Sequence, residues 1–297
     1  MQIGFPKNEK PRILLTGAGG QLGHEFIAIA SKWPQFNILA LGRDDFDISI
    51  ESRVKDFIED HAPDVVINCA AYTNVEKAEE DREHAYLING TAPGWLAEAC
   101  NQSESLLIHY STDYVFEGNI NSPRVETDPV SPINVYGRSK WIGEKNIHSA
   151  TENYLILRVS WLYSTYGHNF FKTMMRLSHE KEELRVVDDQ IASPTYARLL
   201  AHNTMNLIVK YLDRDDFEPG LYHYSETGEA SWYDFTKEIV RLNQSSVNVI
   251  PVATSEFPTK AQRPVYSKLN SSLFTQMSGI SLPTWQESLQ DCFNNHR

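Results

Sequence analysis

The sequence predicts an α/β fold in which a doubly wound parallel sheet occupies the first part of the chain and a smaller lobe follows it. Short apolar runs alternate with amphipathic stretches through the first half, at about every 25–45 residues, which is typical of βαβ units with right-handed crossovers. The runs are apolar at nearly every position, not at alternate ones. This pattern indicates strands that helices cover on both faces.

Each element follows from its residues in order. The apolar runs predict strands at residues 13–15, 38–41, 64–68, 106–110 and 155–159. Apolar residues at helical spacing between them predict helices that start near Leu22, Val54 and Tyr136. A further helix is expected over residues 77–100, with a break near residues 90–93, where Gly90 and Pro93 stand.

The second half is less regular. Amphipathic spacing predicts helices over residues 170–177 and 196–212. Ser231 has the residue type that caps a helix start, and so predicts another helix directly after it. Residues 254–265 and 278–284 are rich in Pro, Ser and Thr and are expected to be loops.

Composition excludes several classes of partner. The 27 basic and 39 acidic residues give a net charge of −12, which argues against nucleic acid because phosphate backbones attract basic surfaces. The three cysteines are far apart and fit neither a disulfide framework nor a zinc site. No apolar run reaches membrane-spanning length, and the first residues show no signal-peptide pattern. We therefore expect a cytoplasmic protein without a membrane or metal partner.

A glycine pattern follows the first predicted strand and begins a helix. Gly17, Gly20 and Gly23 are spaced G-x-x-G-x-x-G, which permits a tight turn, close approach of a pyrophosphate and helix–strand packing. The N–H groups of residues 19–22 at the helix start suit phosphate oxygens. The pattern predicts a dinucleotide-binding, Rossmann-type sheet.

The end of the second strand bears on the choice of dinucleotide. An NAD site usually has an acidic residue there for the ribose hydroxyl, but this chain has Gly42 followed by Arg43. A guanidinium can pair with the 2′-phosphate of NADP. Arg43 therefore favours NADPH, while Asp44 or Asp45 could serve the ribose of NADH, so NADH stays possible.

Tyr136 and Lys140 form a Tyr-x-x-x-Lys pair on one face of a predicted helix. An ammonium near a phenol lowers its pKa, so the tyrosine can exchange a proton with a carbonyl oxygen. Thr112, at the end of the fourth strand, is placed to hydrogen-bond the same carbonyl. Tyr233 and Lys237 have the same spacing, but they follow no strand of the glycine-loop unit and are interpreted as structural.

Several segments together carry a resemblance to a known family. The glycine loop, residues 68–73, residues 111–116 and the Tyr136–Lys140 pair resemble the extended short-chain dehydrogenase/reductase superfamily. More narrowly, the chain is similar to the dTDP-4-dehydrorhamnose reductases, and the similarity extends from about Arg12 to about Trp285. The segments that carry the narrower match are residues 126–128, 132–137, 158–163, 169–170, 189–195, 220–223 and 263–269.

This resemblance implies an organisation and a set of roles. Residues 1–165 are expected to form the NAD(P)-binding domain and residues 166–297 the substrate-binding lobe, with some segments returning to the sheet. Tyr136 is the proton donor, Lys140 binds the nicotinamide ribose, and Thr112 orients the carbonyl. The remaining implied cofactor residues are Gln21, Leu22, Asp47, Ala70, Ala71 and Thr73. The implied substrate residues are Val75, Asp113, Tyr114, Phe116 and Trp161, and Arg263 is the expected partner of the sugar diphosphate.

Some questions stay open at this level. Relatives that dimerise around a metal use glutamates, and only Glu25 fits, since Arg198 and His296 stand at the other two positions. A monomer and a homodimer are both compatible with the sequence. An epimerase or dehydratase acting on a nucleotide sugar is an alternative activity. A second alternative is a non-catalytic NADP-binding regulatory subunit like that of methionine adenosyltransferase.

Overall fold

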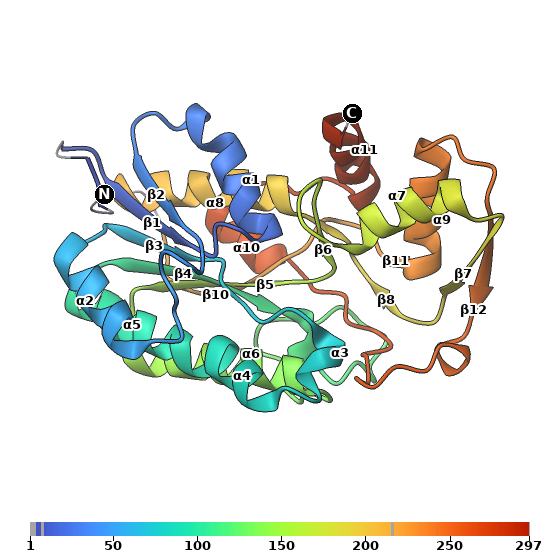
Figure 1. The fold of residues 1–297 in the computed structure, drawn as a ribbon, viewed down its shortest axis with the longest axis horizontal. Coiled ribbons are helices and arrows are strands. Elements are labelled where there is room, and N and C mark those ends of the chain that lie inside the picture. The colour runs from blue at the N-terminus through green and yellow to red at the C-terminus, as the bar shows by residue number, and fades with distance from the viewer. Residues whose placement is uncertain (1–3, 7–8, 215–216, 297) are drawn as a thin grey trace.

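The computed structural model describes residues 4–6, 9–214 and 217–296 (Figure 1). A parallel sheet of six strands forms within these residues, in the order β10-β5-β4-β3-β1-β2. Every neighbouring pair is parallel, which confirms the predicted fold class. The strands are β1 Arg12–Thr16, β2 Asn37–Leu41, β3 Val65–Asn68, β4 Leu106–Thr112, β5 Tyr154–Val159 and β10 Gly220–Tyr224.

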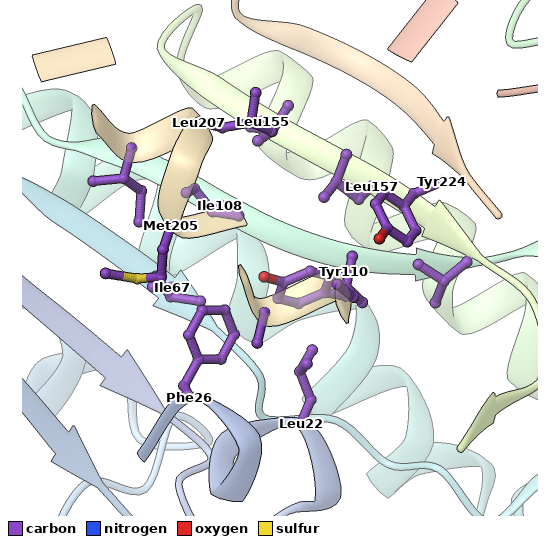
Figure 2. Packing of buried hydrophobic residues seen from close by; sticks show 14 of the residues in the cluster. Leu22, Phe26, Ile67, Ile108, Tyr110, Leu155, Leu157, Met205, Leu207 and Tyr224 are labelled. Carbon is purple, nitrogen blue, oxygen red and sulfur yellow. The ribbon is translucent and has the colours of Figure 1, made fainter. Parts of the chain in front are cut away.

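Helices cover both faces of this sheet, as the fully apolar strands require. One face is covered by α2 Glu51–His61, α5 Ala92–Gln102 and α6 Val135–Ala150, and the other by α1 Gln21–Ile29, α8 Ala197–Leu212 and α10 Ser272–Ser278. Figure 2 shows the core between the sheet and the helices α1, α8 and α10. This core contains Phe26 of α1 and Met205 of α8, together with Ile67, Ile108 and Leu157 of the sheet.

The helical stretch predicted over residues 77–100 is divided differently from the expectation. It contains α3 Val75–Ala78, α4 Arg82–Tyr86, a π-helical turn at Leu87–Thr91 and then α5. The chain stays helical through Gly90 and Pro93, and the break lies at residues 79–81. Pro93 is in the first turn of α5, where a missing N–H is tolerated.

The C-terminal lobe combines short strand pairs with three of the later helices. The pairs are β6 Leu162–Tyr163 with β9 Thr195–Tyr196, β7 Glu183–Val187 with β12 Asn248–Val252, and β8 Ile191–Ala192 with β11 Ala230–Ser231. The helices are α7 Phe170–Glu180, α9 Trp232–Leu242 and α11 Trp285–His296, which share an apolar core. Ser231 and Asp234 form a capping box at the start of α9, which confirms the predicted helix start.

Later segments of the chain return to the sheet. Helix α8 packs on α1, and β10 extends the sheet beside β5. Short 3-10 turns complete the structure at Ala30–Lys32, Asp113–Val115 and Thr254–Glu256. Within the described part of the chain, no helix is long and apolar enough to cross a membrane.

Candidate active site

A cleft of about 660 Å³ opens at the carboxyl end of β1. In the sheet, β1 lies between β2 and β3, and the direction of the strand order reverses there. Ligands of open α/β sheets bind at this position, beyond the carboxyl ends of the strands. Eight of the predicted cofactor residues line the cleft: Gly17, Gly19, Gly20, Arg43, Asp47, Ala70, Ala71 and Thr73. The sequence did not point to the other lining residues, which are Phe46, Ile48, Cys69, Tyr72, Asn74, Lys77, Asp81, His84 and Ile88.

The glycine loop brings backbone close to backbone at the floor of the cleft. Gly17 has φ of 68°, and a Cβ atom there would lie 2.4 Å from the amide nitrogen of Ala70. Gly20 is the N-cap of α1 and provides no side-chain cap for the N–H groups of the first turn. Uncapped N–H groups at a helix start bind anions well. The loop therefore fits the pyrophosphate of a dinucleotide.

Five of the thirteen predicted cofactor residues do not line this cleft: Gln21, Leu22, Gly23, Tyr136 and Lys140. The Gln21 side chain donates to the carbonyl of Leu162 at 3.2 Å and accepts from Asn169 at 3.2 Å. Leu22 is buried in the core under α1, as Figure 2 shows. The Gln21 side chain thus joins the first helix to the lobe, and the Leu22 side chain joins it to the core.

Arg43 lies at the mouth of the cleft and has a carboxylate partner. Its Nε atom is 3.6 Å from Asp47 Oδ2, and its side chain is 68% exposed. Asp47 also accepts from the backbone and hydroxyl of Ser49. These bonds and Arg43 outweigh partial burial and lower the pKa of Asp47, so the pair is ionised at neutral pH.

Thr112 and Tyr136 meet at the end of β4. The Thr112 hydroxyl accepts from the Tyr114 amide and donates to Asp113, both at 3.2 Å. Gly137 lets α6 approach this turn, because a Cβ atom there would lie 2.1 Å from the carbonyl oxygen of Tyr114. The Tyr114 and Tyr136 rings meet edge to face, with centroids 5.9 Å apart.

Tyr136 holds its proton more tightly than the sequence suggested. Burial raises the pKa of Tyr136 to about 12, although a hydrogen bond with Thr112 opposes the rise. The expectation that Lys140 lowers this pKa is therefore not met, because desolvation of the phenolate dominates. At neutral pH Tyr136 is a phenol that can donate a proton.

Lys140 is almost fully buried at 2% exposure. Its Nζ atom donates to the carbonyl of Tyr110 at 2.5 Å and lies 3.2 Å from Nε2 of His109. Burial lowers the pKa of Lys140 to about 8. The amine thus titrates close to neutral pH, unlike an exposed lysine.

Two predicted substrate residues at the end of β4 have different surroundings. Asp113 is buried and accepts from the Ser267 hydroxyl at 2.5 Å, and burial raises its pKa to about 7. Phe116 is fully buried under the guanidinium groups of Arg124 and Arg158. Because Phe116 has no exposed surface, the expectation that it faces the substrate is corrected here, and its role is packing.

Trp161, Val75 and Arg263 come from separate elements. Trp161 has φ of 48° and stacks on Trp232 of the lobe, with centroids 3.6 Å apart. Val75 begins α3. Arg263 donates to Glu76 of α3 at 3.0 Å. Its guanidinium therefore has an anionic partner within the chain.

Asn89 is a buried connection that the sequence did not reveal. Its side chain accepts from the Tyr72 amide at 2.8 Å and donates to the Ser139 hydroxyl at 3.0 Å. Ser139 in turn donates to the carbonyl of Tyr136. Asn89 therefore ties the wall of the cleft to the helix that carries Tyr136. No local pattern could show this, because these bonds join Asn89 to residues 17 and 50 positions away in the chain.

Glu25 has partners within the chain. It accepts from the Ser164 hydroxyl at 2.6 Å and lies 3.7 Å from Nε of Arg198. Over the described ranges, no three His, Cys, Asp or Glu side chains converge as metal ligands would. Position 198 is thus occupied by an arginine that pairs with Glu25.

Comparison with known proteins places the chain in a family. A family model described as RmlD substrate binding domain matches residues 11–297. The chain is 40% identical over 294 residues to dTDP-4-dehydrorhamnose reductase of Escherichia coli K12, covering 95% of this chain and 97% of that protein. A crystal structure of dTDP-4-dehydrorhamnose reductase from Bacillus anthracis in complex with NADP has a TM-score of 0.91 at 38% identity, covering 97% of this chain and 100% of that one.

A more distant neighbour shares the fold alone. UDP-glucose 4-epimerase from Brucella ovis, in complex with NAD, has a TM-score of 0.78 at 18% identity, covering 96% of this chain and 98% of that one. The family match over nearly the whole chain and the identities of 38–40% carry much more weight. They confirm the resemblance drawn from the sequence, and the chain belongs to the RmlD family of dTDP-4-dehydrorhamnose reductases.

Proposed function

We propose that this protein reduces the 4-keto group of dTDP-4-dehydro-L-rhamnose to give dTDP-L-rhamnose, with NADPH as the reductant. The product would serve the synthesis of cell-surface polysaccharide. Family membership supports this reaction. The observation that carries it is the position of the Tyr136 phenol, which lies beside Thr112 at the end of β4 and packs in the same apolar cluster as Tyr72, a residue that lines the cleft. A carbonyl reduction at neutral pH needs such an acid.

In this reaction, the side chains of the protein would hydrogen-bond the carbonyl oxygen of the substrate and transfer one proton to it. NADPH, when bound, supplies the hydride that adds to the carbonyl carbon. The Thr112 hydroxyl, whose one proton is donated to Asp113 in the structure, would turn to donate it to the carbonyl oxygen and fix that oxygen near Tyr136. Tyr136 then gives its hydroxyl proton to that oxygen, and the positive charge of a protonated Lys140 stabilises the resulting phenolate. Solvent restores the proton after the alcohol leaves.

The substrate would lie between the sheet and the lobe. Thr112, Asp113 and Tyr114 come from the end of β4, and Val75 comes from the start of α3. Trp161 would offer a flat apolar face to the sugar, supported from behind by its stacking on Trp232. Arg263 would hold the diphosphate after leaving Glu76, because guanidinium groups bind phosphate in bidentate fashion.

Replacing Arg43 with alanine is expected to raise the KM for NADPH about tenfold and to leave the KM for NADH nearly unchanged. The guanidinium is exposed at the cleft mouth and could exchange Asp47 for the 2′-phosphate. Steady-state kinetics with both dinucleotides would measure this difference. An equal change for NADPH and NADH would contradict the role of Arg43, and a clear preference of the unaltered protein for NADH would do the same.

The decisive assay follows NADPH oxidation with the 4-keto-6-deoxy sugar nucleotide generated in situ. One NADP⁺ released for each dTDP-L-rhamnose formed supports the reductase. An epimerase or dehydratase usually holds NAD tightly and returns the hydride to the same sugar, so it would release none. A regulatory subunit would show no turnover and would recover a methionine adenosyltransferase in a pull-down.

Other parts of the proposal concern partners and location. We place the protein in the cytoplasm, where the nucleotide-sugar substrate is made, as a monomer or homodimer. The net charge of −12 argues against nucleic acid as a partner. An acidic chain must therefore bind its anionic ligands locally, through the start of α1 and the side chains of Arg43 and Arg263.

A further inference from the structure

A buried polar chain links the glycine loop to Lys140, and His109 is its centre. Thr16, directly before Gly17, donates to Asn68 Oδ1 at 2.8 Å. The amide nitrogen of Asn68 lies 3.0 Å from His109 Nδ1, and His109 Nε2 lies 3.2 Å from Lys140 Nζ. All four side chains are at most 4% exposed. Water therefore has little access to any of these contacts.

The backbone decides the direction of these hydrogen bonds. The amide N–H of Ala70 can only donate, and it points to Asn68 Oδ1 at 3.2 Å. This contact fixes the Asn68 side chain with its NH₂ group toward His109, because the flipped amide would set two donors against each other. His109 Nδ1 must accept that bond. In a neutral imidazole, the ring proton is then on Nε2.

The position of this proton has a consequence for Lys140. His109 Nε2–H points at Lys140 Nζ, and only an uncharged amine has a lone pair to accept it. The amine keeps its own donors, one of which is bound by the Tyr110 carbonyl. If Lys140 were protonated, it would lose its hydrogen bond with His109. The alternative is that the ring proton of His109 moves to Nδ1, and then the bond between His109 and Asn68 would be lost. Burial also keeps His109 uncharged, since it lowers the pKa of the imidazole.

We propose that His109 is a positioning residue that holds Lys140 against Tyr110 and weakens the affinity of this lysine for a proton. This role rests on the proposed reductase function, in which the ammonium form of Lys140 stabilises the phenolate. His109 would then set the pH above which the enzyme loses activity. Through Asn68 and Thr16, the same bonds join Lys140 to the loop that would bind the dinucleotide.

The other groups around Lys140 do not replace His109 in this role. Glu144, one turn later on α6, favours the ammonium, but its carboxylate is bound to Arg158 at 2.7 Å and accepts from Ser111. Cys69 faces Lys140 from the end of β3, and burial raises the pKa of this thiol, which is thus neutral. Tyr136, one turn earlier on α6, is a neutral phenol.

The substitution H109Q tests the proposal through a pH profile. A glutamine amide can present its oxygen where Nε2 now lies and accept a bond from the ammonium of Lys140. We expect the alkaline limb of kcat/KM for NADPH, which reports the free enzyme, to move upward by about one pH unit. An alkaline limb that stays in place in an active H109Q variant would overturn the proposal.

A matched variant separates this effect from general damage to the core. Ile108 precedes His109 on β4, is equally buried and packs in the core on the α1 side of the sheet, away from Lys140. I108V is expected to lower stability slightly, through the loss of one buried methyl group, without moving the alkaline limb. Equal displacement of the limb in I108V and H109Q would show that the profile responds to core packing and would overturn the role of His109.

A second measurement needs no turnover and so distinguishes the two proposals. In protein labelled with ¹⁵N-histidine and ¹³C,¹⁵N-lysine, NMR should show His109 with unprotonated Nδ1, and the titration midpoint of Lys140 should rise in H109Q. A proton on Nδ1, or an unchanged Lys140 midpoint, would refute the inference even in an active reductase. Absence of NADPH turnover together with the expected spectra would refute the reductase function alone.

Discussion

Replacing Tyr136 with phenylalanine is expected to lower kcat by about a hundredfold or more and to leave the fold intact. The substitution removes the hydroxyl that donates the proton, and loss of a positioned general acid has an effect of this size. The ring keeps its edge-to-face contact with Tyr114. The Tyr136 backbone keeps the bond from Ser139. Steady-state kinetics and thermal unfolding would measure the two properties separately.

Tyr233 provides the control within the same chain. Tyr233 and Lys237 repeat the Tyr-x-x-x-Lys spacing on α9, but Lys237 Nζ lies over the face of the ring, 5.2 Å from its centroid. A phenyl ring preserves this cation–π contact, so Tyr233→Phe should leave kcat unchanged. Equal losses in both variants would mean that Tyr136 is not the acid, and so would normal turnover by Tyr136→Phe.

Replacing Gly17 with alanine is expected to destabilise the protein by roughly 3 kcal/mol or more and to abolish dinucleotide binding. Positive φ costs a non-glycine residue about 1–3 kcal/mol. Overpacking adds a similar amount, because the new Cβ atom would lie 2.4 Å from Ala70 N and 2.6 Å from Cys69 C. These are backbone atoms of the strand end, which cannot turn aside as a side chain would. Urea unfolding and NADPH titration would measure both effects.

Gly19 is the matched control for Gly17 in the same loop. A Cβ atom at Gly19 meets nothing within 4 Å, and its φ is not positive. Gly19→Ala should therefore change the free energy of unfolding by less than about 0.5 kcal/mol, whatever it does to cofactor binding. Similar destabilisation by both substitutions would show that the loop is sensitive to any side chain, and not to the conformation and packing of Gly17.

The local elements could be predicted because their signals are local. Apolar runs such as residues 65–67 require cover on both faces, and the structure provides it on β3. Ser231 caps a helix through its own neighbours, so its capping box could be predicted from a few residues. The break expected near Pro93 was wrong because the π-helical turn at Leu87–Thr91 leads the chain into α5 without interruption.

By itself the sequence predicted the fold class from its apolar runs and the family through its resemblance to known reductases, and it proposed the chemical groups of the site. Tertiary structure alone decided how those groups behave. Burial keeps the Tyr136 phenol protonated. Phe116 is packed under two arginine side chains, out of reach of a ligand. Lys140 lies on α6, but its partners His109 and Tyr110 come from β4, and the direction of the bond with His109 follows from the backbone of Ala70. Desolvation and hydrogen bonding depend on which distant residues meet, and no local pattern records that.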